Sequence, residues 1–268
     1  MPLCLRAIVL FAAVLGSVQG LAGIKTRSFV FSPKVDDKPK LILISGCPGT
    51  GKSTFGMSVA LDQGILKCIS TDTVRAVMRS FVTKEVSPAL HRSSYAAANE
   101  NDDPVRSWLE TCTVLSNGVE DLVDDAINRG QSLVFEGVHI IPSRNLIDKW
   151  VSAGGVATGC MLKIKDAEAH KMMLRRRGFI TGKGDPEEEK IKSFDRIRAI
   201  QDDMVRRAEE AQWLLIEQKL DPDPLEMISN NLLGVDLAPL SLPKSETKID
   251  LSFIEEPFAV GASTNGEI

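Results

Sequence analysis

Short apolar runs recur along the chain, and longer stretches with helical spacing of apolar residues separate them. A continuous apolar run is typical of a strand that is buried on both faces of a parallel sheet. Such runs lie at residues 40–45, 65–70, 132–137, 159–164 and 213–218. They predict about five strands.

Three of the intervening stretches carry apolar stripes at the i, i+3, i+4 spacing of an amphipathic helix. The stripes contain Val74, Val77, Met78 and Phe81; Trp108, Cys112, Leu115, Val119, Leu122 and Ala126; and Ile191, Phe194, Ile197, Met204 and Ala208. Strands that alternate with helices predict an α/β fold with a parallel sheet and right-handed crossovers. We place this domain at residues 38–234.

Three segments depart from the alternation. Residues 79–107 are polar and are expected to form an insertion over the edge of the sheet. After Leu233 the sequence turns to Pro, Ser and Glu, so we expect residues 235–268 to form a poorly ordered tail. Residues 1–37 have the apolar core and small residues of a targeting leader, too short to span a membrane.

The leader has no acidic residue before Asp36, which is compatible with an organellar address as well as with plain secretion. Free thiols and a need for ATP favour an organelle, a plastid or a mitochondrion, over the extracellular space. If the leader is not functional, the protein is cytoplasmic. The five cysteines are odd in number and widely spaced, so we expect reduced and mostly buried thiols.

Composition narrows the class of protein. The chain has 268 residues, 43% of them hydrophobic and 25% charged, and its formal net charge is −4. These values are typical of a soluble globular protein and give no support to a nucleic-acid-binding surface. We expect no stable membrane insertion once the leader is removed.

The residues after the first apolar run satisfy the phosphate-loop pattern G-x-x-x-x-G-K-[ST]. Such a loop turns its backbone N–H groups toward phosphate oxygens, and the following helix adds the positive end of its dipole. Lys52 is expected to reach the β- and γ-phosphates of ATP, and Ser53 to offer its hydroxyl to Mg²⁺. The residues expected to hold the nucleotide are Gly46, Gly49, Thr50, Gly51, Lys52, Ser53 and Thr54.

Two carboxylates follow other apolar runs. Glu136 ends the third run and would stand beside the loop, on the metal side, if that strand neighbours the first. Asp72 ends the second run, with Arg75 and Arg79 four residues apart on the next helix. Asp72 can accept a proton from a substrate hydroxyl, or simply cap the helix, and the arginines can bind an anion. The pattern predicts an ATP-dependent kinase of a small anionic molecule; a non-catalytic ATP-binding regulator is the contrasting class.

The order of the motifs is more specific than any one of them. The phosphate loop, "STDTVRAVMR", "LHRSSYAA", "VFEGVHIIP" and "FDRIRAIQDDMVRRA" resemble, over residues 40–220, the 2-phosphoglycerate kinases. They are also similar to the P-loop domain of plant proteins linked to phytic acid accumulation. The resemblance implies a P-loop NTPase three-layer sandwich of the nucleoside-monophosphate-kinase type. It also implies phosphoryl transfer from ATP to 2-phosphoglycerate, giving 2,3-bisphosphoglycerate. Another small anion, such as an inositol phosphate or a sugar acid, is the alternative acceptor.

The resemblance also implies roles for residues that the pattern alone leaves undecided. It favours a substrate wall at His91, Ser94 and Tyr95, and a substrate contact at Arg198. His139 could face the acceptor or be structural. The basic, glycine-broken segment 174–189 suits a lid that closes over the transferring phosphoryl group, with Arg176 as the catalytic candidate.

Overall fold

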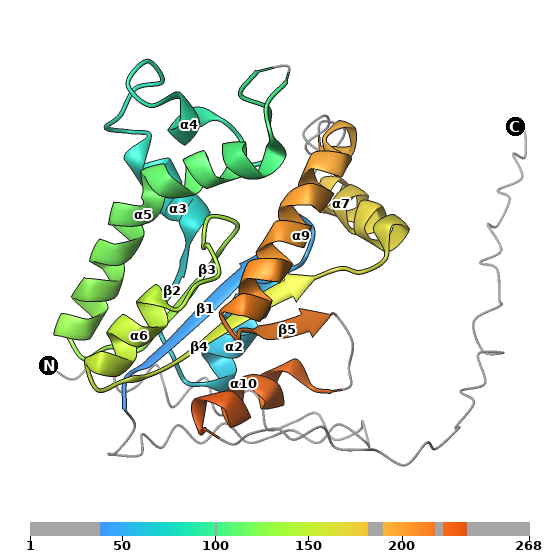
Figure 1. The fold of residues 1–268 in the computed structure, drawn as a ribbon. Helices are drawn as coiled ribbons and strands as arrows, with labels where there is room; N and C mark the ends of the chain where they lie inside the picture. Colours follow the sequence, from blue (N-terminus) through green and yellow to red (C-terminus); the bar gives the residue numbers. More distant parts are fainter. Residues whose placement is uncertain (1–37, 100, 182–189, 218–221, 235–268) are drawn as a thin grey trace, which may run out of the picture.

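A computed structural model describes residues 38–99, 101–181, 190–217 and 222–234. Five parallel strands form one sheet in the order β2-β3-β1-β4-β5 (Figure 1). The strands are β1 (Lys40–Gly46), β2 (Cys68–Ser70), β3 (Leu133–Gly137), β4 (Val156–Lys163) and β5 (Leu214–Glu217). The predicted P-loop kinase type of α/β fold is confirmed, and each expected apolar run forms one strand.

Helices connect and flank these strands. They are α2 (Lys52–Asp62), α3 (Thr71–Met78), α4 (Pro88–His91), α5 (Pro104–Asn128), α6 (Asn145–Ser152), α7 (Ala167–Thr181), α9 (Phe194–Glu210) and α10 (Pro224–Leu232). Local sequence explains the sharpest helix starts. Asp103 caps α5 by accepting from the Arg106 amide at 2.7 Å, and Pro104 follows at the first helical position.

The sheet lies between two helical layers, and β1 contributes side chains to the core on both of its faces. Leu41 and Leu43 join a core cluster with residues of α5, α6 and α9, whereas Ile42 and Ile44 join a second cluster with α2 and α10. All four side chains are buried, and each stabilises the fold by roughly 2 kcal/mol. Successive residues of a strand point to opposite faces, which is why a run without polar residues is needed here.

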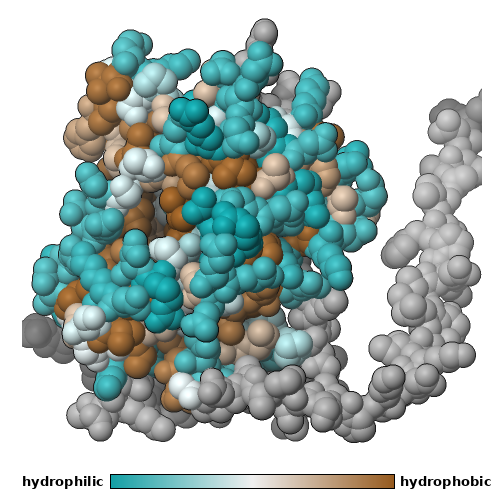
Figure 2. Space-filling view, viewed as in Figure 1, coloured by the Kyte–Doolittle hydropathy of each residue, from teal (hydrophilic) through white to brown (hydrophobic). Residues whose placement is uncertain are grey.

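Two expectations of burial are wrong. The stripe through Phe81 was expected to continue the helix after β2, but α3 ends at Met78 and Phe81 is 83% exposed. Cys68 is also exposed, because β2 is the edge strand. Figure 2 shows hydrophobic surface at the upper left, over the segment around α4, where Phe81 and Val86 are exposed.

The predicted insertion corresponds to residues 79–103, between α3 and α5, and contains α4 (Figure 1). It lies on the side of the sheet where β2 forms the edge. Within the described residues, no helix is both long and apolar enough to cross a membrane. The leader at residues 1–37 and the tail at 235–268 lie outside the described residues.

Candidate active site

The phosphate loop joins β1 to α2 and is shaped by its glycines. Gly49 and Gly51 have φ angles of 85° and 78°, which side chains strongly disfavour. A Cβ atom at Gly46 would lie 2.8 Å from the Leu162 carbonyl oxygen and the Thr50 hydroxyl. Gly51 also caps α2 without any side-chain hydrogen bond, so the first N–H groups of the helix face the loop. This geometry can hold an anion.

Two polar side chains of the loop fold back onto its backbone. Lys52 is half-buried and its Nζ donates to the Cys47 carbonyl at 3.0 Å; the Thr50 hydroxyl donates to the same oxygen at 2.8 Å. The thiol of Cys47 is fully buried, and this burial raises its pKa to about 12. Cys47 is therefore a packing residue of the loop and no nucleophile.

Glu136 stands where the sequence predicted a carboxylate beside the loop. Because β3 is the direct neighbour of β1, Glu136 is the register partner of Ile44. Its Oε1 accepts a hydrogen bond of 3.1 Å from the hydroxyl of Ser53. Gly56 of α2 faces the Glu136 side chain, so α2 packs directly over this residue. Hydroxyl and carboxylate oxygens of this kind are ligands that Mg²⁺ prefers.

Helix α7 supports the loop from the other side. His170, which is buried, has its Nε2 2.8 Å from the Pro48 carbonyl, and Leu174 lies against Gly49. The edge of the His170 ring packs on Phe194 of α9. Sequence reasoning missed His170; the only signal was a histidine four residues before the segment interpreted as a lid. It contributes rigidity to the backbone that surrounds the phosphates.

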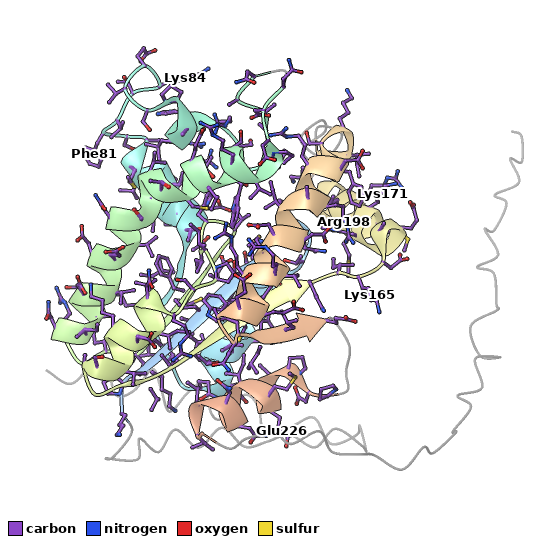
Figure 3. All side chains as sticks on the ribbon, viewed as in Figure 1. Phe81, Lys84, Lys165, Lys171, Arg198 and Glu226 are labelled. Atoms are coloured by element: carbon purple, nitrogen blue, oxygen red, sulfur yellow. The ribbon has the colours of Figure 1, made fainter. Side chains whose placement is uncertain are left out.

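Arg198 also lies on this side of the site (Figure 3). Its Nη1 donates to the Ile164 carbonyl at 2.6 Å and its Nη2 to the Lys165 carbonyl at 3.2 Å. These two contacts make Arg198 fix the segment after β4; the predicted substrate contact stays a prediction. The charge of Arg198 also lowers the pKa of Cys47 slightly against the effect of burial.

Asp72 lies in the first turn of α3, at the end of β2. Ser70, and not Asp72, caps the helix, by accepting from the Asp72 amide at 3.2 Å. The side chain of Asp72 is 73% exposed and its Oδ1 lies 3.8 Å from Nδ1 of His139. The strands are parallel, so Asp72, after β2, and the phosphate loop, after β1, lie at the same end of the sheet. One strand, β3, lies between them.

The two arginines of α3 serve the insertion. Arg75 is buried; its Nε donates to the Leu90 carbonyl at 2.8 Å, and its Nη2 donates to the Arg92 carbonyl. These contacts give Arg75 a structural role in the insertion, and its predicted contact with the acceptor stays a prediction. Arg79 donates to the Leu90 carbonyl through Nε, at 2.9 Å. Among the described residues its terminal nitrogens have no hydrogen bond, so it stays a candidate for anion binding.

The expected substrate wall is mostly interior. His91 binds the Val82 carbonyl through Nε2 at 2.8 Å, and Ser94 and Tyr95 are buried. His139 is buried as well, and its ring lies behind Asp72 with no exposed surface of its own. These four side chains thus occupy interior or backbone-bound positions, and for His139 this favours the structural alternative; the acceptor contact of the other three stays a prediction. Of the predicted lid at 174–189, residues 182–189 and the side chain of Arg176 lie outside what the structure describes.

Comparison with known proteins supports the motif resemblance. No protein-family model matches the chain. The 2-phosphoglycerate kinase of Methanocaldococcus jannaschii is 34% identical over 185 residues, which are 67% of this chain and 59% of that protein. That of Methanopyrus kandleri is 36% identical over 183 residues, 66% of this chain and 55% of that protein. The chain thus spans less than two thirds of these relatives.

Solved structures with a related arrangement have low sequence identity. Shikimate kinase from Acinetobacter baumannii, in complex with shikimate, aligns with 74% of this chain and 95% of that chain, at 15% identity and a TM-score of 0.43. The resemblance to 2-phosphoglycerate kinases that the motifs indicated is confirmed by the sequence matches.

Proposed function

We propose that this chain transfers the γ-phosphoryl group of ATP to the hydroxyl of 2-phosphoglycerate, forming 2,3-bisphosphoglycerate and ADP. The observation that carries the proposal is the pairing of Ser53 with Glu136 at a complete phosphate loop, with Asp72 exposed at the end of a nearby strand. The names of the relatives support the choice of acceptor.

The donor half of the reaction rests on the phosphate loop. Its backbone N–H groups and Lys52 hold the β- and γ-phosphates and neutralise the charge that develops during transfer. Ser53 and Glu136 would hold Mg²⁺, either directly or through water, and their oxygen donors fit that ion. When bound, the metal supplies further charge neutralisation on the phosphates.

A cavity beside the loop is the proposed place of the nucleoside. Its volume is about 570 Å³, and it opens between the segment after β4 and the end of β5. The lining residues are Lys163, Ile164, Lys165, Asp166, Ala169, Met173 and Glu217. Arg198 fixes the backbone of this wall through its two carbonyl contacts. Since β4 is the other neighbour of β1, a nucleotide held by the loop can extend into this space.

The acceptor half of the reaction is assigned to Asp72 and Arg79. The acceptor hydroxyl oxygen attacks the γ-phosphorus while the bond from that phosphorus to the bridging oxygen of ADP breaks. Asp72 takes the hydroxyl proton, a role that suits an exposed carboxylate at a strand end. The terminal nitrogens of Arg79 would bind a phosphate or carboxylate oxygen of the acceptor.

The test is a ³¹P NMR assay of the purified chain with Mg²⁺ and ATP. Acceptors are supplied one at a time: 2-phosphoglycerate, 3-phosphoglycerate, glycerate, gluconate and inositol phosphates, each beside a Lys52→Ala control. We expect 2,3-bisphosphoglycerate from 2-phosphoglycerate and none with the control. If only gluconate or an inositol phosphate is phosphorylated, that compound replaces 2-phosphoglycerate as the proposed acceptor. Tight ATP binding without turnover of any acceptor would make the chain a nucleotide-binding regulator instead.

A further inference from the structure

His139 occupies a rigidly built position behind Asp72. It follows β3, and the backbone on both sides of it is anchored: the indole of Trp108 donates to the Val138 carbonyl at 2.8 Å, and the Ser45 hydroxyl donates to the Ile140 carbonyl at 2.6 Å. The imidazole itself has no exposed surface. A ring held in this way presents its nitrogens in fixed directions.

The two ring nitrogens have different surroundings. Nδ1 lies 3.0 Å from the hydroxyl of Thr71 and 3.8 Å from the carboxylate of Asp72. Nε2 is buried and has no hydrogen-bond partner among the described residues. A buried N–H without an acceptor is more costly than an unused lone pair, so the proton belongs on Nδ1. This tautomer directs the N–H at the Thr71 hydroxyl, with the Asp72 carboxylate close by at 3.8 Å.

The position of Thr71 is equally constrained. Its side chain packs against Gly137, where any Cβ atom would collide with it. Glycine at this place lets the start of α3 approach the end of β3 closely enough for the imidazole to reach both Thr71 and Asp72. The close approach of the ends of β2 and β3 therefore brings the His139 ring next to Thr71 and Asp72.

Burial keeps the imidazole neutral. Burial lowers the pKa of His139 to about 4; Asp72 opposes this shift, whereas the positive charges of Arg75, Lys52 and Arg79 add to it. At physiological pH the neutral imidazole can still donate a hydrogen bond through Nδ1. It adds no positive charge that would itself attract the anionic acceptor.

We infer that His139 is a positioning residue for Asp72: its Nδ1–H donates to the Thr71 hydroxyl at the start of α3, and the ring so fixed lies 3.8 Å from the carboxylate that takes the proton of the acceptor and helps to orient it. The inference rests on the proposed function, because it gives Asp72 the role of proton acceptor. It differs from the substrate contact expected from the sequence, since His139 acts from behind the carboxylate without touching the acceptor.

A pair of amide variants tests the inference. In His139→Asn the side-chain nitrogen takes the place of Nδ1, whereas in His139→Gln it reaches the place of Nε2. We expect His139→Asn to keep kcat within about threefold of the wild type, and His139→Gln to lose about tenfold or more, with KM for ATP unchanged in both. Equal losses in two variants of equal thermal stability would overturn the inference.

A double-variant cycle with Asp72→Asn identifies the route of the effect. If His139 acts through Asp72, His139→Gln has almost no further effect on kcat once Asp72 is replaced. If the losses of kcat from the two substitutions multiply in the double variant, His139 acts independently of Asp72, which contradicts the inference.

A spectroscopic measurement separates the contact from the proposed activity. The chain has three histidines, so ¹⁵N-labelled imidazoles can be assigned by replacing each in turn. We expect the Nδ1–H tautomer for His139 and a changed Nδ1 shift in Asp72→Asn. An Nε2–H tautomer, or a shift unaffected by Asp72, would overturn the inference even in an active enzyme. Failure of every acceptor to react, with the expected spectra, would instead overturn the proposed function and the catalytic use of the contact.

Discussion

The phosphate loop and the insertion at 79–103 flank the same end of the sheet, yet different kinds of contact shape them. In the loop, Lys52 and Thr50 bind the Cys47 carbonyl and His170 of α7 binds the Pro48 carbonyl. In the insertion, arginines bind the backbone: Arg75 donates to the Leu90 carbonyl, and Arg196 of α9 donates to the Tyr95 carbonyl at 3.0 Å. Figure 3 shows Arg198 and Lys171 on the loop side and Phe81 and Lys84 on the insertion.

The two regions differ in how far a basic residue in the sequence indicates anion binding. A loop that binds phosphate through its backbone needs few side chains, so a short motif describes it well. On the insertion side, Arg75 and Arg196 bind backbone carbonyls and so serve the fold. A cluster of arginines near a proposed acceptor site therefore contains both structural and anion-binding members, and only their hydrogen bonds distinguish them.

The largest expected effect separates the carboxylates of the two sides. Asp72→Asn should lower kcat by about a hundredfold to ten-thousandfold with ATP affinity nearly unchanged, because it removes the proton acceptor. Glu136→Gln should instead raise the Mg²⁺ concentration that gives half the maximal rate. A Mg²⁺ titration of both variants, beside an equilibrium ATP-binding curve, measures the contrast. If Asp72→Asn changes the Mg²⁺ requirement and Glu136→Gln does not, the two assignments are reversed.

The loop side alone is tested by Lys52→Ala. Loss of this charge should lower kcat/KM by about a hundredfold to a thousandfold. The unfolding free energy should fall by only ~1 kcal/mol, because Lys52 is half-buried and its hydrogen bond to the Cys47 carbonyl contributes an amount of that order. Lys84→Ala, on the insertion, is the matched control and should leave both quantities unchanged. Near-normal turnover in a folded Lys52→Ala protein would contradict the loop assignment.

The insertion side is tested by comparing its two arginines. Arg75→Met should destabilise the fold by roughly 3 kcal/mol, because it leaves the Arg92 carbonyl without its charged donor and removes one of the two donors to the Leu90 carbonyl. Arg79→Met should destabilise it by ~1 kcal/mol and raise KM for the acceptor. Chemical denaturation and steady-state kinetics measure these effects. Equal stability losses, or an acceptor KM that responds only to Arg75, would mean that the structural and binding roles are assigned the wrong way round.

The smallest effect tests the proposed nucleoside cavity. Ala169→Phe should fill part of the cavity and raise KM for ATP by about tenfold, with little change in KM for the acceptor. Ala167→Phe is the control, since Ala167 is exposed at the start of α7 and does not line the cavity. An unchanged KM for ATP in Ala169→Phe would remove the nucleoside from this cavity.

Local pattern predicted the parts that depend on local physics. The apolar runs predicted all five strands, and the stripe through Trp108 and Cys112 predicted the buried face of α5. The place of Glu136 beside the loop followed from a strand order that the sequence only suggested, and the register with Ile44 confirms it.

The remaining errors concern contacts between distant segments. Nothing near Arg75 in the sequence indicates that Leu90 will place a carbonyl against it, and nothing near His170 indicates the Pro48 carbonyl. Phe81 fits the helical spacing, but the chain leaves the helix at Met78 before that residue can be buried. Such choices are decided by packing after the elements have formed, so a single sequence predicts the elements better than the partners of their polar side chains.

The central place of β1 also determines when the site can form during synthesis. Leu41 pairs with Leu133 and Ala157, so both neighbours of β1 are translated long after it. Until β3 and β4 leave the ribosome, the apolar run at residues 41–44 has no strand beside it and is an aggregation-prone segment of the nascent chain. Closing such long loops makes folding slow. The phosphate-binding function thus emerges late, only after most of the domain has been synthesised.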